Sequence, residues 1–237
     1  MSELNQNRKI AFIEFMLEAG ALRFGSFTTK SGRKTPYFIN TGAYRKGSQL
    51  ARLGDFYADA MFDAHQDQID NLFGPAYKGI PLAVVAAEAL FRRHNLDVTY
   101  TFNRKEAKDH GEGGVLVGYD YGSVKKDSTL SSIPACRVVL VEDVTTAGTS
   151  VRESLPLIES RGAKVVGLVV SVDRMERGTG TQSALREISD AHGIKTTAIV
   201  SLSDLLDYLA SPVGAKHIVN DPALLARMQA CRETYGV

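Results

Sequence analysis

Apolar positions near the beginning of the chain follow a helical pattern and then flank a turn. Apolar residues recur at helical spacing over residues 10–17, and Gly20 follows as a stop signal. Aromatic residues on both sides of residues 30–33 are typical of two strands joined by a hairpin turn. A second amphipathic helix is predicted over residues 50–61, with Ser48 as its N-cap. The chain is therefore predicted to open with a helix, a hairpin and a helix.

From residue 69 onward, short apolar segments alternate with amphipathic ones. Strands are predicted at residues 69–73, 98–102, 115–119, 138–141, 165–172 and 196–200. Helices are predicted at residues 80–94, 150–160, 181–192, 203–210 and 221–232. The segments 138–141 and 165–170 are continuous apolar runs, which is typical of strands buried on both faces. This alternation predicts an α/β fold with a central parallel sheet flanked by helices.

Two long polar segments interrupt the alternation. Residues 103–114 are polar and end in glycines, and residues 121–136 show no apolar periodicity. Both are predicted to be loops, and loops of this length in a compact domain are usually functional or disordered.

The composition excludes several classes of protein. The 237 residues are 44% hydrophobic and 23% charged, which favours one folded domain over residues 1–237. A formal net charge of +1 gives no support to a nucleic-acid or membrane-surface protein, and no apolar run is long enough to span a membrane. Residues 1–9 lack the apolar core of a signal peptide, and Cys136 and Cys231 are typical of reduced thiols in a cytoplasmic protein.

The near-neutral total conceals an uneven distribution of charge. Between Glu18 and Asp55 the sequence has seven basic residues and no acidic one, so the rest of the chain carries a net negative charge. This basic N-terminal part is suited to attract an anionic substrate.

The strongest chemical signal lies in residues 138–150. An apolar strand there ends in Glu142 and Asp143, followed by a turn of small residues with Gly148 and the start of a helix. Ligands collect at the carboxyl ends of strands in open α/β sheets, and a helix N-terminus suits a phosphate. Because the two acids would repel that phosphate, they point to sugar hydroxyls or a bound cation beside it. The alternative is an ordinary turn with exposed acids and a threonine N-cap.

This segment resembles the signature of the type I phosphoribosyltransferases, which is an apolar strand, an acidic pair and Thr-Ala-Gly-Thr. Further segments resemble the orotate phosphoribosyltransferases within that family: residues 30–38, 73–80, 102–114, 172–178 and 233–237. Three features depart from the family pattern. They are Glu142 in place of an aspartate, Ile39 in place of a second phenylalanine, and an insertion at residues 121–136.

The resemblance implies a type I phosphoribosyltransferase fold, with a small N-terminal hood formed by a helix and a β-hairpin, mostly within residues 1–45. It also implies that residues 103–114 form a mobile catalytic loop. The implied reaction transfers the phosphoribosyl group of 5-phosphoribosyl 1-diphosphate to orotate. The products are orotidine 5′-phosphate and diphosphate, in pyrimidine (UMP) biosynthesis, with Mg²⁺ as cofactor.

The chemistry of that reaction fits the charged residues. Cleavage of the C1–diphosphate bond places negative charge on the leaving group, which calls for cations, and positive charge on the ribose, which calls for acids such as Asp143. The candidate catalytic cations are Arg104, Lys105, Lys108 and His110. Either Lys108 or His110 is suited to protonate the leaving group, and the sequence does not choose between them. The alternative for this segment is a solvated surface loop of mixed charge.

The resemblance also implies the substrate contacts. Those to phosphoribosyl diphosphate are Lys30, Tyr77, Lys78, Arg104, Lys105, Lys108, His110, Glu142, Asp143, Val144, Thr145, Thr146, Ala147, Gly148, Thr149 and Ser150. Those to orotate are Phe38 and Ile39 against the ring, Thr146 as a hydrogen-bonding group, and Arg174 at the carboxylate. The alternative for Arg174 is a surface ion pair with Asp173 or Glu176. Mg²⁺ is expected to be held by substrate and water rather than by a protein cage.

Members of this family act as homodimers, so residues 103–114 are expected to reach the neighbouring subunit's site, with Lys105 as the residue that serves it. Two other functions remain open at this stage: transfer to a different base, and a non-catalytic regulator that binds nucleic acid. The complete segment 103–114 argues against the regulator, which has no need of a catalytic lid.

Overall fold

The central sheet of the protein has six strands in the order β5-β4-β3-β6-β7-β8. The structure is a computed structural model that describes residues 3–29, 32–66, 68–108, 114–121, 135–145, 148–178, 180–219 and 221–237. The strands are β3 (Asn71–Gly74), β4 (Thr99–Lys108), β5 (Gly114–Gly118), β6 (Arg137–Glu142), β7 (Lys164–Asp173) and β8 (Lys195–Ser201). Neighbouring strands from β4 to β8 are parallel, which confirms the predicted sheet, whereas the edge strand β5 runs antiparallel to β4.

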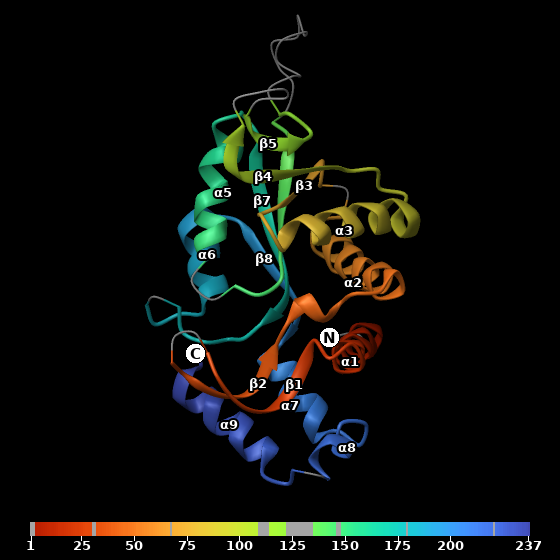
Figure 1. Cartoon of the computed structure of the whole chain (residues 1–237), viewed down its shortest axis with the longest axis vertical. Helices are drawn as coiled ribbons and strands as arrows, with labels where there is room; N and C mark the ends of the chain where they lie inside the picture. The colour runs from red at the N-terminus through yellow and green to blue at the C-terminus, as the bar shows by residue number, and fades with distance from the viewer. Residues whose placement is uncertain are drawn as a thin grey trace, which may run out of the picture.

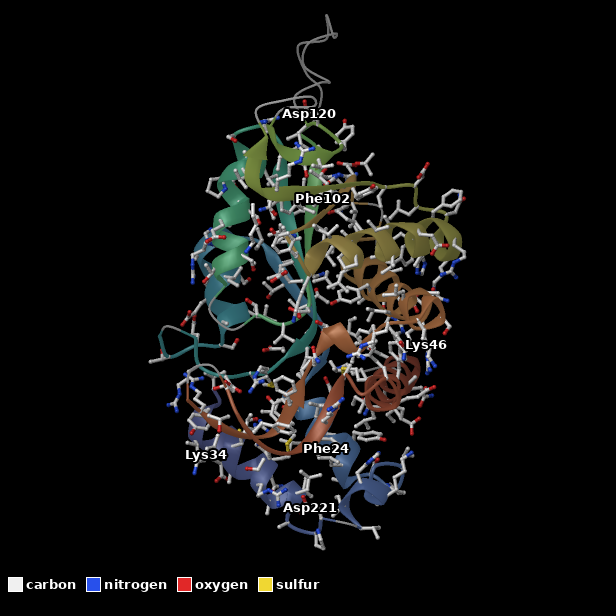
Figure 2. The ribbon with its side chains drawn as sticks, viewed as in Figure 1. Phe24, Lys34, Lys46, Phe102, Asp120 and Asp221 are labelled. Carbon is white, nitrogen blue, oxygen red and sulfur yellow. The ribbon has the colours of Figure 1, made fainter. Side chains whose placement is uncertain are left out.

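Helices cover both faces of this sheet, with α2 (Gly47–His65) and α3 (Gly79–His94) on one side and α5 (Thr149–Glu159) and α6 (Ala184–His192) on the other (Figure 1). Side chains fill the space between the sheet and the helices (Figure 2). Val139 and Val141 of β6 belong to the core with α2 and α3, while Val138 and Leu140 belong to the core with α5 and α6. The apolar run is therefore buried on both faces, as its pattern predicts.

The N-terminal helix and hairpin form a separate layer at one end of the sheet (Figure 1). Helix α1 (Glu3–Glu18) is followed by the antiparallel strands β1 (Leu22–Thr28) and β2 (Lys34–Ile39), and a short 3₁₀ helix (Thr41–Ala43) leads to α2. The C-terminal helices α7 (Leu202–Ala210), α8 (Ala215–Ile218) and α9 (Leu224–Tyr235) pack in the same region. The sequence does not predict α8, nor that α9 lies against β2.

The predicted loop 103–114 differs from the structure. Strand β4 continues to Lys108 and β5 begins at Gly114, with Asn103 paired to Leu116 and Lys108 paired to Gly114. The backbone pairing of an edge ribbon does not require apolar side chains, so a polar sequence can still form strand. Residues 109–113 lie outside the described residues.

Two other boundaries also differ. Helix α2 has Lys46 rather than Ser48 as its N-cap, because the side chain of Gln49 accepts hydrogen bonds from the backbone N–H groups of Arg45 and Lys46. Tyr121, the first residue of the predicted insertion, is 5% exposed and donates a hydrogen bond of 2.7 Å to Oδ1 of Asn71. Tyr121 is therefore part of the core, and residues 122–134 lie outside the described part of the chain.

Cys136 and Cys231 are free thiols. Among the helices of the described residues, none has the length and apolar character needed to cross a membrane.

Candidate active site

The acidic pair and the loop after β3 meet at one edge of the sheet. Strands β3 and β6 are parallel neighbours, so their carboxyl ends lie side by side. Gly79 makes this approach possible, because a Cβ there would lie 2.7 Å from Cδ of Pro75 and 2.9 Å from the carbonyl oxygen of Val141. The missing side chain at Gly79 therefore lets the turn at residues 75–78 sit directly against the end of β6.

Asp143 is held by three donors. Its Oδ1 accepts from the backbone N–H of Val144 at 2.7 Å, and its Oδ2 accepts from Oγ1 of Thr41 at 2.6 Å and Nζ of Lys78 at 3.1 Å. The Asp143 side chain is 15% exposed, whereas that of Lys78 is 61% exposed. The structure thus brings Lys78 and Asp143 together, with the carboxylate fixed and the ammonium facing solvent.

Glu142 lies in a more enclosed position. Its carbonyl oxygen accepts from the hydroxyl of Tyr57 at 2.6 Å, and its Oε2 accepts from Oγ of Ser150 at 2.8 Å. Burial, reinforced by the nearby charge of Asp143, raises the pKa of Glu142 to about 7, against the opposing effects of Ser150 and Lys78. The carboxyl group therefore changes protonation state near neutral pH.

The turn after the acids is described in part. Val144 packs against the core on the α2 and α3 side, and Thr145 is partly buried. Gly148, at φ +66°, precedes the first residue of α5, Thr149, and a Cβ at Gly148 would lie 2.8 Å from Cδ1 of Ile188. Thr146 and Ala147, predicted to contact the substrates, lie outside the described residues.

Strand β4 brings Lys105 to the same edge. Oδ1 of Asn103 accepts from the backbone N–H of Ala76 at 2.9 Å, which ties β4 to the turn at residues 75–78. Nζ of Lys105 lies 5.5 Å from the centre of the Tyr77 ring, and Tyr77 is 69% exposed. Lys105 is therefore brought next to the predicted diphosphate-binding turn.

The other predicted cations of this segment are less fully placed. Nη1 of Arg104 donates to the carbonyl oxygen of Gly114 at 3.3 Å, across the ribbon formed with β5. Lys108 ends β4, and the structure describes its backbone position alone. His110 and Lys30 lie outside the described residues.

Arg174, which follows β7, lies against an aromatic ring from the hairpin. The central guanidinium carbon is 4.7 Å from the centre of the Tyr37 ring. Its Nε and Nη2 donate to Oε1 of Glu176 at 2.8 and 2.5 Å. The two side chains are 11% and 14% exposed, so the ion pair considered for Arg174 forms with Glu176 but is largely buried.

The two side chains that were predicted to contact the orotate ring, Phe38 and Ile39, are successive residues of β2. Phe38 is 42% exposed and stacks on Phe27, with ring centres 5.4 Å apart. Ile39 packs against the core. Successive residues of a strand point to opposite faces, so β2 does not present Phe38 and Ile39 to the same side. The ring beside Arg174 is that of Tyr37, which sequence reasoning missed and which the same alternation could have indicated.

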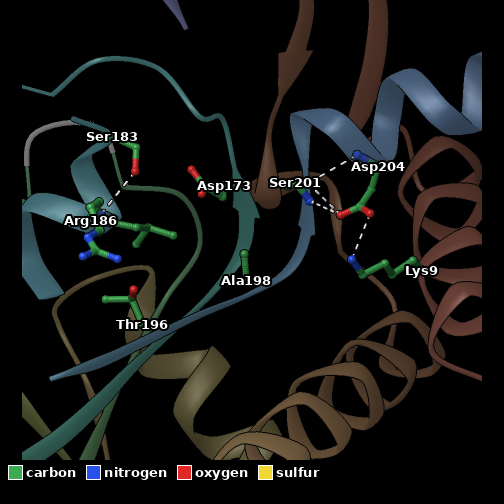
Figure 3. Close-up of a pocket in the computed structure, with 9 residues that line it drawn as sticks. Lys9, Asp173, Ser183, Arg186, Thr196, Ala198, Ser201 and Asp204 are labelled. Atoms are coloured by element: carbon green, nitrogen blue, oxygen red, sulfur yellow. Dashed lines mark hydrogen bonds and ion pairs between the residues drawn. The ribbon is translucent and has the colours of Figure 1, made fainter. Parts of the chain in front are cut away.

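A separate pocket lies along β8 and beside the end of β7 (Figure 3). Nζ of Lys9 lies 2.9 Å from Oδ1 of Asp204, and the other oxygen of Asp204 accepts from Ser201. Burial raises the pKa of Asp173 at its wall. Of the described residues that line this pocket, none is a predicted site residue, and most of its charges are already paired.

No group of three histidine, cysteine, aspartate or glutamate side chains that could hold a metal ion occurs within the described ranges. The carboxylates at the site are Glu142 and Asp143, and both already accept hydrogen bonds. Oxygen ligands of this kind suit a hard cation such as Mg²⁺.

Comparison with known proteins gives a consistent result. A family model described as the phosphoribosyl transferase domain matches residues 40–191. The chain is 50% identical over 231 residues to the orotate phosphoribosyltransferase of Lachnoclostridium phytofermentans, covering 97% of each chain. It is 50% identical over 227 residues to that of Cronobacter sakazakii, covering 95% of this chain and 97% of the relative. The crystal structure of the Francisella tularensis orotate phosphoribosyltransferase is similar with a TM-score of 0.79 and 36% identity, covering 96% of this chain and all of the other.

Proposed function

The chain belongs to the orotate phosphoribosyltransferase family, and on that premise we propose that it transfers the phosphoribosyl group of 5-phosphoribosyl 1-diphosphate to orotate. The bond between C1 and the diphosphate oxygen breaks, and a bond between C1 and N1 of orotate forms. Diphosphate leaves, and the proton of N1 is released. The observation that carries this proposal is the meeting of Lys78, Glu142 and Asp143 where β3 and β6 end.

The acids of the site suit the ribose. Asp143 is fixed by Thr41 and by the backbone of Val144, so its carboxylate needs little reorganisation to accept a sugar hydroxyl. Glu142, held by Ser150, lies beside it on the same chain segment. Two carboxylates near C1 also stabilise the positive charge that develops on the ribose as the bond to diphosphate breaks.

The cations suit the leaving group. Lys78 faces solvent at the turn after β3, and Lys105 lies over the neighbouring Tyr77. Charge-assisted hydrogen bonds from these ammonium groups to diphosphate oxygens are strong once water is excluded. We assign Arg104, Lys108 and His110 to the same task from the sequence, with Lys108 or His110 as the proton donor to the leaving oxygen.

The base is expected to meet Arg174. A guanidinium pairs with a carboxylate through two parallel hydrogen bonds, which suits the carboxylate that distinguishes orotate from uracil. The buried ring of Tyr37 packs against this guanidinium. We expect Phe38 and Thr146 to contact the pyrimidine ring itself.

Mg²⁺ fits the donor set of this site. Glu142 and Asp143 offer carboxylate oxygens, but Asp143 already accepts three hydrogen bonds. We therefore expect phosphate oxygens, ribose hydroxyls and water to supply most of the ligands of the Mg²⁺ ion. When bound, the ion neutralises charge on the diphosphate.

We further propose that the protein is a homodimer. Val84 and Phe91 of α3 are seven residues apart, on one face of the helix, and are 40% and 56% exposed. Tyr100 of β4, a strand in contact with α3, is also 40% exposed. Such a surface suits a second copy of the chain, which would bring residues 103–114 of one subunit to the site of the other.

Subunit complementation tests the shared site. Lys105→Ala and Arg174→Ala variants should each be weak alone, but mixed dimers should regain one intact site, and about a quarter of wild-type activity after statistical exchange. A mixture no more active than its components would mean that Lys105 serves its own subunit.

A base panel tests the activity itself. The purified protein, with phosphoribosyl diphosphate and Mg²⁺, should consume orotate in a spectrophotometric assay, and should leave uracil and hypoxanthine unchanged. Turnover of uracil or hypoxanthine without orotate would refute the assignment. We place the enzyme in the cytoplasm, where a reducing environment keeps thiols such as Cys136 and Cys231 free.

A further inference from the structure

The carboxylate of Glu176 lies between two arginines from distant parts of the chain. Its Oε1 accepts from Nε and Nη2 of Arg174, and its Oε2 accepts from Nη1 of Arg33 at 3.0 Å. Arg33 immediately precedes β2 of the N-terminal hairpin, and Arg174 immediately follows β7 of the central sheet. Their like charges repel, and the shared carboxylate allows both to remain beside the same partly buried site.

These contacts constrain the guanidinium of Arg174 in two ways. The Tyr37 ring lies against the guanidinium, with 4.7 Å between the ring centre and the central guanidinium carbon, and the hydrogen bonds from Nε and Nη2 to Glu176 restrict its rotation. Glu176 thereby occupies the side of the guanidinium formed by Nε and Nη2. The end of the guanidinium formed by Nη1 and Nη2 can still donate to the carboxylate of a ligand. A planar fork held in this way can bind a second carboxylate with little further loss of side-chain entropy.

The backbone around Glu176 is fastened to the C-terminal segment. Glu176 forms a β-bridge with Gly236, the N–H of Arg177 donates to the carbonyl oxygen of Tyr235 at 2.9 Å, and the guanidinium of Arg33 lies 5.4 Å from the centre of the Tyr235 ring. The backbone of Glu176 is therefore held in place, which allows its carboxylate to hold Arg174 in one position.

We propose that Glu176 is a positioning residue for orotate recognition, which acts by orienting Arg174 toward the carboxylate of the base. This inference rests on the proposed function. It assigns to Glu176 a role in selecting a carboxylated pyrimidine over an uncharged one, without contact between Glu176 and the substrate.

Substitution of Glu176 by the isosteric glutamine is the direct test. In glutamine an NH₂ donor replaces one of the two carboxylate oxygens, so one of the two arginines would face a donor instead of the acceptor that it meets in Glu176. We expect Glu176→Gln to raise the KM for orotate about 10- to 100-fold, because a small misplacement of a binding group has an effect of that size. The KM for phosphoribosyl diphosphate should stay within about twofold of wild type, since Arg174 does not bind that substrate.

Glu14→Gln is the matched control. Glu14 forms an exposed ion pair of 3.0 Å with Lys216, far from β7 in the chain, and its substitution should leave both KM values unchanged. Glu176→Asp, which keeps the charge but is one methylene shorter, should give an intermediate KM for orotate. The same two readouts on Glu176→Asp decide the question if the glutamine variant does not fold.

A double-mutant cycle separates positioning from general structural damage. If Glu176 acts through Arg174, adding Glu176→Gln to Arg174→Ala should cause less than about a twofold further change in kcat/KM for orotate. The inference would be overturned if the two substitutions lowered kcat/KM for orotate independently in the double variant. It would also be overturned if Glu176→Gln left the KM for orotate unchanged, or raised the KM values for both substrates equally. Wild-type protein that does not turn over orotate would instead refute the proposed function, which keeps the two failures distinct.

Discussion

Nζ of Lys78 lies 3.1 Å from Oδ2 of Asp143, and this ion pair joins the turn after β3 to the end of β6. Because Lys78 is 61% exposed, this ion pair contributes little stability, about 0–1 kcal/mol. Lys78 can therefore move to a diphosphate oxygen at small cost, while Thr41 and the backbone of Val144 keep Asp143 in place.

Lys78→Ala should consequently affect binding more than folding. We expect the KM for phosphoribosyl diphosphate to rise about 10- to 100-fold, the usual effect of removing a hydrogen bond to a charged group. The free energy of unfolding should change by less than about 1 kcal/mol. Initial rates at saturating orotate and urea denaturation measure the two quantities.

Lys216→Ala provides the control for Lys78. Lys216 is 59% exposed and forms an ion pair of 3.0 Å with Glu14, so it has similar geometry without a place at the site. Its substitution should leave the KM for phosphoribosyl diphosphate unaltered. If Lys78→Ala behaves like Lys216→Ala in this assay, Lys78 has no part in substrate binding.

The pKa of Glu142, raised to about 7 by burial, predicts a pH dependence of activity. The ionised carboxylate accepts hydrogen bonds from ribose hydroxyls more strongly than the protonated acid does, so kcat/KM for phosphoribosyl diphosphate should rise with pH through about 7. Glu142→Gln should lower this ratio and remove that inflection from the profile. Superimposable profiles for the two proteins would show that the inflection belongs to another group.

The same carboxyl group should also affect stability. The pKa of a glutamate in the unfolded chain is about 4.3, so the folded state binds this proton more tightly than the unfolded state does. The stabilisation that the bound proton gives the folded state is lost as the pH rises through about 7. Raising the pH from about 4 to 8 should lower the stability of the wild type relative to Glu142→Gln by up to about 3 kcal/mol. Urea denaturation of both proteins at the two pH values measures the difference, and a constant difference would contradict the prediction.

Gly79→Ala should disturb the turn at residues 75–78. The added Cβ would lie 2.9 Å from the backbone carbon of Gly74 and from the carbonyl oxygen of Val141, neither of which can rotate away. Overpacking of this kind usually costs about 1–3 kcal/mol. In Gly47→Ala the new Cβ meets nothing within 4 Å, so this variant should unfold at the same urea concentration as wild type or a higher one. Equal stability of the two variants would mean that the turn adjusts freely.

Lys108→Ala tests the catalytic assignment that rests on sequence. If Lys108 stabilises or protonates the leaving diphosphate, turnover at saturating substrates should fall by about 10²- to 10⁴-fold. Single-turnover measurements with both substrates saturating separate this effect from weaker binding. A decrease of less than about threefold would remove Lys108 from the chemistry.

The sequence alone was sufficient for the features that depend on neighbours in the chain. The apolar run Val138–Val141 predicts a strand buried on both faces, and Glu142, Asp143 and Gly148 follow it within a few residues, so the order of strand, acids and turn is local. The polar composition of residues 103–108 misled the same reasoning, because the pairing of β4 with β5 is set by backbone hydrogen bonds rather than by apolar side chains.

The tertiary structure decided which distant residues meet. The parallel arrangement of β3 and β6 brings Lys78 to Asp143. The packing of the hairpin against α9 and against the segment after β7 brings Arg33 to Glu176 and Tyr37 to Arg174. Arg33 and Glu176 are 143 residues apart, and no periodicity in the sequence relates them. A local pattern determines the period, burial and ends of an element, whereas contacts across the chain depend on how the finished elements pack. The sequence therefore relates Arg174 to the nearby Glu176, but it does not show that Tyr37 and Arg33 meet them.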